Sequence, residues 1–320
     1  MNVLTITSPP SASVAEALDR FERDFQYPLG THDTFRISHG TDYSRFFRAM
    51  GKGVSFVAER NDKVVGTLGM ALRKIRQPDA TEIKVAYIGD LKVSSAVRRT
   101  GVVPLALFQA GLAWAWQNGA TKAYGVVMDG TKASPSDYTG RIGIPKFLEV
   151  AKVVVLRIPT NLAGNGIESR GSVISAATLE STYKRLTASV HAPVGGRPSL
   201  RSSFAPMRLA SADGQACGLL EDTMRAKRLI SSNGEELLSA HLSRFAFAKS
   251  GVKSAVELLE TALTLAAARG FPAMFVAVDT RTAQVLRPHI ERFNPVEAPA
   301  TIYGFGFVPG QELLINTAEI

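Results

Sequence analysis

The chain has 320 residues, of which 45% are hydrophobic and 20% are charged, and its formal net charge at pH 7 is +9. This length suffices for two domains of about 150 residues each, and this balance of apolar and charged residues excludes a wholly disordered chain. The single cysteine, Cys217, excludes an intramolecular disulfide framework and is typical of a reducing compartment. No signal-peptide pattern opens the sequence, and its longest apolar stretch, 105–116, is too short to span a bilayer. We therefore expect a cytoplasmic protein with no membrane partner.

The positive charge favours anionic partners in general, but its distribution disfavours nucleic acid. The Lys and Arg residues are scattered, and the only dense groups in the first half are 73–76 and the pair Arg98 and Arg99. A small ligand that carries phosphate groups accounts for the same excess with fewer assumptions. We therefore expect a phosphate-bearing small molecule rather than nucleic acid as the partner, and a homodimer stays open.

In chain order, the first half predicts two helices, three strands, and then helix, strand, helix and strand. The apolar periods place these elements at residues 13–27, 42–50, 54–60, 64–73, 84–93, 104–118, 122–128, 135–146 and 147–158. Short connections predict that the three consecutive strands form an antiparallel meander. The strand, helix and strand that follow make a βαβ unit, so we expect 84–93 and 122–128 to be parallel.

The second half repeats this order after a segment rich in Gly and Pro. That segment, 159–203, contains one short helix, and the later periods predict strands and a helix at 207–210, 216–220, 237–248, 254–269 and 273–278. The stretch from Gly119 to Asp129 matches that from Gly270 to Asp279, which favours an internal duplication. We therefore expect a first domain at 1–160, a linker at 161–205 and a second domain at 206–320. The Gly-rich stretch 304–310 predicts a β-hairpin.

The segment between the strand 84–93 and the helix 104–118 carries the clearest chemistry. A strand ends at Val93, a basic loop with Gly101 follows, and Pro104 suits the first turn of the helix. Amides at a helix N-terminus beside an arginine form a ready phosphate site. The alternative is an ordinary turn between a strand and a helix with two solvated arginines.

This segment resembles the GCN5-related N-acyltransferases (GNAT), which carry Arg/Gln-x-x-Gly-x-Gly/Ala after a Leu-x-Val strand end. The matching residues are Leu91, Lys92, Val93, Arg98, Arg99, Thr100, Gly101, Val102 and Val103. The resemblance implies an α/β (α+β) fold, in which a mixed, mostly antiparallel sheet is flanked by helices. It also implies that the loop amides cradle the pyrophosphate of acetyl-CoA and that the strand end pairs with the pantetheine arm. Val103 departs from the family, where Gly or Ala is usual, and we expect its branched side chain to narrow the room beside the pyrophosphate.

The same resemblance implies an acceptor that is a primary amine of a small molecule or peptide, and it nominates three catalytic side chains. Tyr87 and Asp90 lie on the strand that usually carries the general base, and Tyr138 lies where a tyrosine can reprotonate the thiolate. Strand alternation places Tyr87 on the same face as Leu91 and Val93, and Asp90 on the opposite face. The structural alternatives are a core aromatic for Tyr87, a capping carboxylate for Asp90 and a helix-surface position for Tyr138.

Two function classes remain open. The first is the acyltransferase, and the second is a module of the same fold that binds acyl ligands or protein partners without catalysis. The corresponding loop of the second half, 247–253, has a Gly and two lysines but lacks the Arg-x-x-Gly spacing, so we expect a degenerate copy. The five histidines show no zinc-type spacing, so we expect no metal. The sequence also has neither a nucleophile elbow nor a P-loop.

Overall fold

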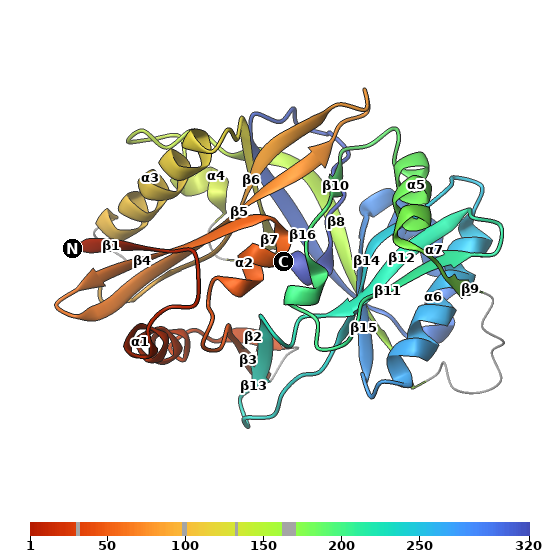
Figure 1. The fold of residues 1–320 in the computed structure, drawn as a ribbon, viewed down its shortest axis with the longest axis horizontal. Helices are drawn as coiled ribbons and strands as arrows, with labels where there is room; N and C mark the ends of the chain where they lie inside the picture. Colours follow the sequence, from red (N-terminus) through yellow and green to blue (C-terminus); the bar gives the residue numbers. More distant parts are fainter. Residues whose placement is uncertain (30–32, 98–100, 132–133, 162–170) are drawn as a thin grey trace.

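The computed structural model describes residues 1–320 except 30–32, 98–100, 132–133 and 162–170. Two halves lie side by side, with the N-terminus at the outer edge of the first half and the C-terminus in the centre of the molecule (Figure 1). Within the described residues, one 13-stranded sheet runs through both halves in the order β1-β4-β5-β6-β7-β16-β8-β15-β14-β12-β11-β9, with β10 paired to β5.

The first half places helices on both faces of its part of the sheet. Its strands are β1 (Asn2–Ile6), β4 (Lys52–Arg60), β5 (Lys63–Arg76), β6 (Glu82–Val93) and β7 (Lys122–Met128). Apolar residues of α1 (Ala12–Glu22) and α2 (Arg45–Met50) pack on one face, and those of α3 (Val102–Gln117) pack on the other, followed by the short α4 (Pro135–Tyr138). Burial is nearly continuous along β4 and β5, because successive side chains point alternately into the two cores of a sheet that is covered on both sides.

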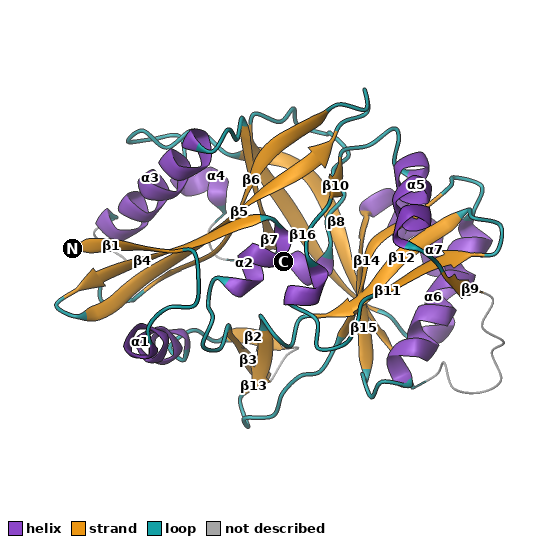
Figure 2. Cartoon of the chain, in the orientation of Figure 1, coloured by secondary structure: helices purple, strands orange, loops and turns teal. Residues whose placement is uncertain are grey.

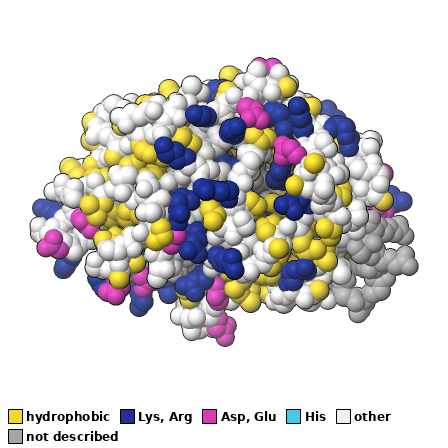
Figure 3. All heavy atoms as spheres, in the orientation of Figure 1, with side chains coloured by type: hydrophobic (Ala, Val, Ile, Leu, Met, Phe, Trp, Pro, Cys, Tyr) yellow, Lys and Arg dark blue, Asp and Glu magenta, His cyan; other side chains and the backbone are white. Residues whose placement is uncertain are grey.

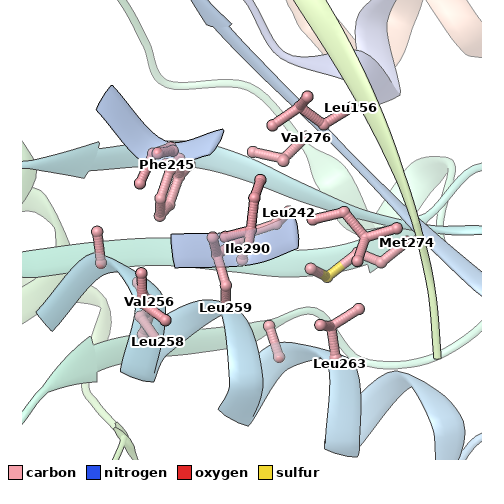
Figure 4. Close-up of a cluster of buried hydrophobic side chains, with 14 of the residues drawn as sticks. Leu156, Leu242, Phe245, Val256, Leu258, Leu259, Leu263, Met274, Val276 and Ile290 are labelled. Atoms are coloured by element: carbon pink, nitrogen blue, oxygen red, sulfur yellow. The ribbon is translucent and has the colours of Figure 1, made fainter. Parts of the chain in front are cut away.

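The second half repeats this layering. Its elements are β9 (Gly171–Val173), α5 (Ala176–Leu186), β10 (Ala192–Val194), β11 (Met207–Ser211), β12 (Ala216–Asp222), β14 (Ala240–Phe247), α6 (Val252–Ala267), β15 (Ala273–Asp279) and α7 (Thr280–Ile290). The close-up in Figure 4 shows Leu259 and Leu263 of α6 directed at Met274 of β15 and Leu242 of β14. This continuous apolar core explains the strong helical signal of 254–269.

The halves are joined because their last strands cross over. The strand β8 (Leu148–Pro159) follows the first half in sequence but pairs with β15, and β16 (Val296–Phe305) follows the second half but pairs with β7. The two crossing strands also pair with each other. The expected hairpin at 304–310 is wrong, because β16 ends at Phe305 and both of its partners are distant in sequence. The domain limits stay a prediction, since the sheet is continuous across residue 160.

A second, three-stranded sheet lies beside α2 (Figure 2). It is formed by β2 (Tyr27–Leu29), β3 (Asp33–Ser38) and β13 (Arg228–Ser231), so that one strand comes from the second half. Short 3-10 turns complete the described chain at η2 (Pro198–Leu200), η3 (Glu291–Phe293) and η4 (Thr317–Glu319). This small sheet brings the segment around Lys227 close to the first half.

Two expected helices are shorter than predicted, for identifiable reasons. The first ends at Glu22, because Tyr27 pairs with Phe35 in the small sheet. The helix expected at 135–146 is the single turn α4, since Gly140 and Gly143 adopt φ angles of 81° and 75° that a helix does not allow. The expected parallel pairing of 84–93 with 122–128 is confirmed. No helix among the described residues is long and apolar enough to cross a membrane.

Candidate functional site

A split between β6 and β7 defines the candidate site. The parallel ladder joins Val85 to Lys122, Ala86 to Ala123 and Tyr87 to Tyr124, and it ends there. Just beyond the last pair, a Cβ on Gly125 would lie 2.7 Å from the carbonyl oxygen of Ile88, so this position tolerates only glycine. Two parallel strands that separate beyond such a contact leave backbone groups along their edges without a ladder partner.

A β-bulge on β6 lies three residues beyond the last pair. The register of β5 against β6 shifts between Thr67–Lys92 and Gly69–Gly89, so that Leu68 faces both Asp90 and Leu91. Asp90 itself adopts a left-handed conformation, with a φ of 56°. An extra residue in one strand turns every later side chain to the other face.

The bulge overturns the expected faces of β6. Tyr87 packs with the α2 core, whereas Leu91 and Val93 pack with the α3 core. The Asp90 carboxylate contacts Tyr43, which precedes α2, and therefore lies on the side of Tyr87. Alternation without a bulge predicts the reverse, and nothing in the local sequence signals the extra residue.

Five side chains form a buried charged network around this bulge, which we call the bulge cluster: Glu22, His39, Tyr43, Asp90 and Lys92. Lys92 Nζ lies 2.6 Å from Asp90 Oδ1 and 2.8 Å from Glu22 Oε1. His39 Nδ1 lies 2.7 Å from Glu22 Oε1, and the Tyr43 hydroxyl donates a hydrogen bond to Asp90 Oδ2. Oxygen and nitrogen atoms of Glu22, His39 and Asp90 come within 4.8 Å of one another. The Lys92 ammonium already binds two of these groups, so it holds the place that a metal ion would need.

The ionisation of the bulge cluster follows from these contacts. Burial opposes the charged form of Glu22, but His39 and Lys92 prevail and lower its pKa to about 2. Burial and the nearby charge of Asp90 raise the pKa of Tyr43 well above its usual value. Burial lowers the pKa of the neighbouring Lys227 to about 8, against the opposing charge of Asp90. At neutral pH the cluster therefore holds Glu22 ionised and Tyr43 protonated.

The cofactor loop expected from the sequence is described only in part. Arg98, Arg99 and Thr100 lie outside the described residues. Gly101 is the residue before α3 and adopts a φ of 68°, which favours glycine. The first turn of α3 begins at Val102, and amides of a first turn are not paired within the helix.

Val103 does not obstruct this end of the helix. Its side chain is buried in the core between α3 and the sheet, and a Cβ on Gly66 of β5 would lie 2.7 Å from Val103 Cγ1. The branched side chain therefore points into the core, and the narrowing expected from the sequence is wrong. The missing Cβ at Gly66 makes room for the extra methyl groups.

The other predicted residues are placed as follows. Tyr87 is 4% exposed and packs edge-on against Tyr124 with ring centroids 5.4 Å apart. Tyr138 is half-buried in α4 and lies against Phe108 with centroids 6.2 Å apart, on the α3 side of the sheet. Burial raises the pKa of Tyr138 to about 12, so it is protonated at neutral pH. Asp90 and Tyr138 therefore lie on opposite sides of the sheet, and their catalytic roles stay predictions.

Sequence reasoning missed the side chains of Glu22, His39, Tyr43 and Lys92 as one cluster. One signal was present: Lys92 stands among the apolar residues of a central strand, where an ammonium requires a buried partner. The identity of that partner could not be read, because Glu22 is 70 residues away in sequence.

The second half contains a matching split between β14 and β15. Its ladder ends at the pair of His241 with Phe275, and Arg244 lies three residues further with a φ of 52°. The register of β12 against β14 shifts between Cys217 and Leu219, so Gly218 faces two residues, as Leu68 does in the first half. The two splits therefore share their register and their bulge.

The chain's own C-terminal segment occupies this second split. The Arg244 amide donates a hydrogen bond to Asn316 Oδ1 at 2.8 Å. The Thr317 hydroxyl lies 3.0 Å from His241 Nδ1 and donates to the carbonyl oxygen of Phe275 at 3.3 Å. Asn316 and Thr317 therefore bridge β14 and β15 just beyond their last pair. The next residue but one, Glu319, is held by buried Arg73 and Arg201.

The surface around α2 is basic. Lys and Arg side chains gather along the middle of the face shown in Figure 3, over α2 and the small sheet. Arg197 Nη2 donates to the carbonyl oxygens of Arg48 and Gly51 at 3.0 and 3.2 Å, which ties the segment before η2 to the end of α2. Part of the net positive charge is thus concentrated near the boundary of the two halves.

Comparison with known proteins identifies the fold. Saccharomyces cerevisiae N-myristoyltransferase with bound myristoyl-CoA matches with a TM-score of 0.64 and 10% identity, over 95% of this chain and 82% of that chain. A putative acetyltransferase from Pyrococcus horikoshii matches with a TM-score of 0.58 and 14% identity, over 98% of this chain and 92% of that chain. No family model and no curated protein matches the sequence. The chain thus shares the fold of these two proteins, and the expected mixed, mostly antiparallel sheet flanked by helices is confirmed.

Proposed function

We propose that this protein is an acyl-CoA-dependent N-acyltransferase that transfers an acetyl group to a primary amine of a small molecule or peptide. The observation that carries the proposal is the split between β6 and β7, which opens beyond Tyr87 and Tyr124 beside the N-terminus of α3. Solved structures of the same fold include one that holds myristoyl-CoA. The sequence Arg98-x-x-Gly101 supports the proposal because it resembles the motif with which GNAT acyltransferases bind the cofactor's pyrophosphate.

The cofactor would lie along the edge of β6 and end at the split. Amides of the first turn of α3 and the arginines of the preceding loop would bind the pyrophosphate, since both present positive charge to an anion. The pantetheine arm would add to the edge of β6 at 91–93 like an extra strand. Gly101 supports this arrangement because its left-handed conformation turns the chain from the loop into the helix.

The second split indicates how the first would hold a carbonyl. There the amide of the bulge residue Arg244 donates to an amide oxygen, that of Asn316, at 2.8 Å. Asp90 is the counterpart of Arg244 in register and in backbone conformation. We infer that the Asp90 amide donates to a carbonyl oxygen of the acyl-CoA, where it would stabilise the charge that develops during attack.

The reaction then needs two proton transfers. The amine nitrogen attacks the thioester carbon, a C–N bond forms, the C–S bond breaks and the amine gives up a proton. Tyr138 remains protonated at neutral pH, which suits it to supply a proton to the leaving sulfur. Of the two groups expected to receive the amine proton, Tyr87 stays protonated at neutral pH because burial raises the pKa of its hydroxyl well above the usual value. The proton would then pass to Asp90 or to a water molecule.

An acetyl group rather than a long acyl chain fits the base of the split. Tyr87 and Tyr124 are 4% and 3% exposed, and their rings close the end of the split on the α2 side. On the α3 side, Ile88 and Leu107 are buried in a second core. A long chain would have to displace one of these cores, whereas two carbons need no such change.

One observation favours the second candidate, a binding module without catalysis. Both oxygens of the Asp90 carboxylate already accept hydrogen bonds, from Lys92 and Tyr43. A carboxylate whose two oxygens are both occupied by buried donors is not oriented towards an incoming amine. Binding without turnover would follow if no other group accepts the amine proton.

Calorimetric titration with acetyl-CoA tests the cofactor site. We expect saturable binding by the wild type and a loss of at least about ten-fold in affinity for Arg98→Ala combined with Gly101→Glu. The matched control is Lys249→Ala in the corresponding loop of the second half, which we expect to bind like the wild type. Absence of binding by the wild type would overturn the cofactor site. Thiol release with a panel of primary amines then separates the enzyme from the binding module.

A further inference from the structure

The bulge residue of each half adopts a backbone conformation that its residue type disfavours. Asp90 has a φ of 56° and Arg244 a φ of 52°. Residues other than glycine are uncommon in this region outside turns, and inside a strand the cost of the conformation has to be offset by neighbouring groups. The question is therefore which groups enforce it at the two bulges.

In the first half, hydrogen bonds hold both the carboxylate and the backbone carbonyl of Asp90. Its carboxylate accepts hydrogen bonds from Lys92 Nζ at 2.6 Å and from the Tyr43 hydroxyl. Its carbonyl oxygen accepts a hydrogen bond from Thr67 Oγ1 at 3.2 Å. Lys92, Tyr43 and Thr67 are each at most 2% exposed, so these contacts are made in the protein interior.

In the second half, Arg244 is fastened by different chemistry at the same position. Its guanidinium donates to Glu180 Oε2 at 2.6 Å and lies 4.5 Å from the centre of the Tyr183 ring. Both partners belong to α5, which covers the same face of the sheet as α1 and α2 do in the first half. The Asp90 carboxylate and the Arg244 guanidinium thus occupy equivalent places. Each is a charged side chain that holds a left-handed residue through contacts with neighbouring side chains.

We propose that Asp90 is a positioning residue rather than the general base: its buried carboxylate fixes the left-handed bulge so that the backbone amide is aimed into the split. This inference rests on the proposed function for its consequence in catalysis. Arg244 holds the same left-handed conformation with a side chain of opposite charge, so what the two positions share is a charged anchor for the bulge. The saturation of both Asp90 oxygens argues the same independently.

The charged surroundings of Asp90 come from several elements. Lys92 lies on β6 itself, Tyr43 and His39 precede α2, and Glu22 lies on α1. Tyr27 of β2 and Lys227 before β13 also act on the cluster electrostatically. An ammonium 2.6 Å from one carboxylate oxygen and a hydroxyl donor on the other hold the Asp90 side chain in one orientation.

Substitutions at Asp90 separate anchoring from base catalysis. Glycine and asparagine tolerate the left-handed conformation, and alanine does not. We expect kcat to fall in the order Asn, Gly, Ala, with Ala about ten-fold below Gly, and we expect the acidic limb of the pH–kcat/KM profile to persist in Asp90→Gly. A general base would instead give similar losses of about a hundred-fold or more in all three variants, without that limb, and this result would overturn the proposal.

Removal of an anchor group provides an independent check that leaves Asp90 in place. Tyr43→Phe deletes the hydroxyl that donates to Asp90 but keeps the buried ring. Anchoring predicts a lower kcat with KM for acetyl-CoA rising in parallel, because the aimed amide is lost. If Asp90 were the base, the freed carboxylate would be more basic and the rate would hold or rise.

Amide hydrogen exchange tests the anchor without turnover. We expect residues 88–92 to exchange at least several-fold faster in Asp90→Ala than in Asp90→Gly, and Asp62→Ala to leave them unaffected. Asp62 is the matched control because it is also left-handed, with a φ of 57°, but lies exposed in the turn between β4 and β5. Equal exchange in the Ala and Gly variants would contradict anchoring. A wild type that binds no acetyl-CoA would overturn the proposed function alone, since exchange still decides the anchor.

Discussion

The splits between β6 and β7 and between β14 and β15 have the same register and differ in what fills them. In each, the parallel ladder ends three residues before a left-handed bulge residue, and a 16-residue helix follows the bulged strand. Asn316 and Thr317 fill the second split, whereas no such bridge joins β6 and β7 among the described residues. The same split beside a bulge is therefore a candidate ligand site in the first half. In the second half it binds the chain's own C-terminal segment.

The difference also shows in the residues beside the splits. A loop with Arg98 and Gly101 precedes the helix of the first half, and a loop without an arginine precedes that of the second. The filled split in turn fixes the C-terminal segment, whose Glu319 joins Arg73 of β5 to Arg201. The second split thus carries a structural link between the halves, and four measurements test this contrast.

The largest expected effect on stability is at Glu319, which anchors the C-terminal segment whose Asn316 and Thr317 occupy the second split. Its carboxylate lies 2.8 Å from Arg73 Nη2 and 3.2 Å from Arg201 Nη1, and all three side chains are buried. Glu319→Gln leaves the buried Arg73 without its carboxylate partner, whereas Arg201 keeps Glu221, so we expect a loss of about 3 kcal/mol or more in the free energy of unfolding. Urea denaturation followed by circular dichroism measures it.

Glu312→Gln is the control for that loss. Glu312 lies in the same C-terminal segment, but its side chain is 54% exposed and 3.9 Å from Arg281, so we expect a change within about 0.5 kcal/mol. Equal effects of the two substitutions would show that Glu319 is not a buried link between the halves.

The next effect concerns the bulge cluster, which has no carboxylate–histidine counterpart at Arg244. The pKa of Glu22 is lowered to about 2, so its ionised form stabilises the fold above the unfolded pKa of about 4.5 and this contribution is lost as the pH falls towards 2. We expect Glu22→Gln to reduce the free energy of unfolding at pH 7 by roughly 3 kcal/mol and to flatten its decline between pH 5 and pH 3. Urea titrations at several pH values measure both quantities.

The control at Glu22 is Glu16→Gln on the same helix. Glu16 is 72% exposed and lies 3.9 Å from Arg20, so its removal should leave the pH dependence as in the wild type. A Glu22→Gln variant with an unchanged acid limb would contradict the ionised buried carboxylate.

A smaller effect is expected where Gly66 of β5 meets Val103 of α3. The second half carries Ala216 at the place of Gly66, since both residues pair with the last residue of the bulged strand. A Cβ at Gly66 would lie 2.7 Å from Val103 Cγ1, so we expect Gly66→Ala to cost about 2 kcal/mol. In the double variant with Val103→Ala, much of that cost should be absent. Additive losses in the double-mutant cycle would disprove the contact.

Local elements were predictable because their periods are local. The strand Lys122–Met128 was delimited correctly, and its parallel pairing followed from the intervening helix. The crossing of β8 and β16 was not predictable, because the sequence of a strand does not name its partner. The helix expected at 135–146 does not extend past its first turn, because Gly140 and Gly143 adopt left-handed φ angles that are set by the loop that they form.

The candidate site was predictable only where it depends on sequence motifs. The strand end at Val93 was found, and the helix was expected from Pro104, two residues after it begins at Val102. The bulge at Asp90 was not found, because it is defined by a register shift against β5. The bulge cluster joins residues of α1, of the segment between β3 and α2, and of β6, which only the tertiary fold brings together, so Glu22 and His39 gave no local signal.

The central claim is that acetyl-CoA binds in the first split and that the second split is closed to it. Amide hydrogen exchange with and without acetyl-CoA tests this claim directly, because both bulged strands can be followed in the same sample. We expect protection of residues 88–93 and 101–106 on binding, and no change at 242–247 and 252–256. Protection of the second set, or of neither set in the presence of saturating acetyl-CoA, would contradict the account.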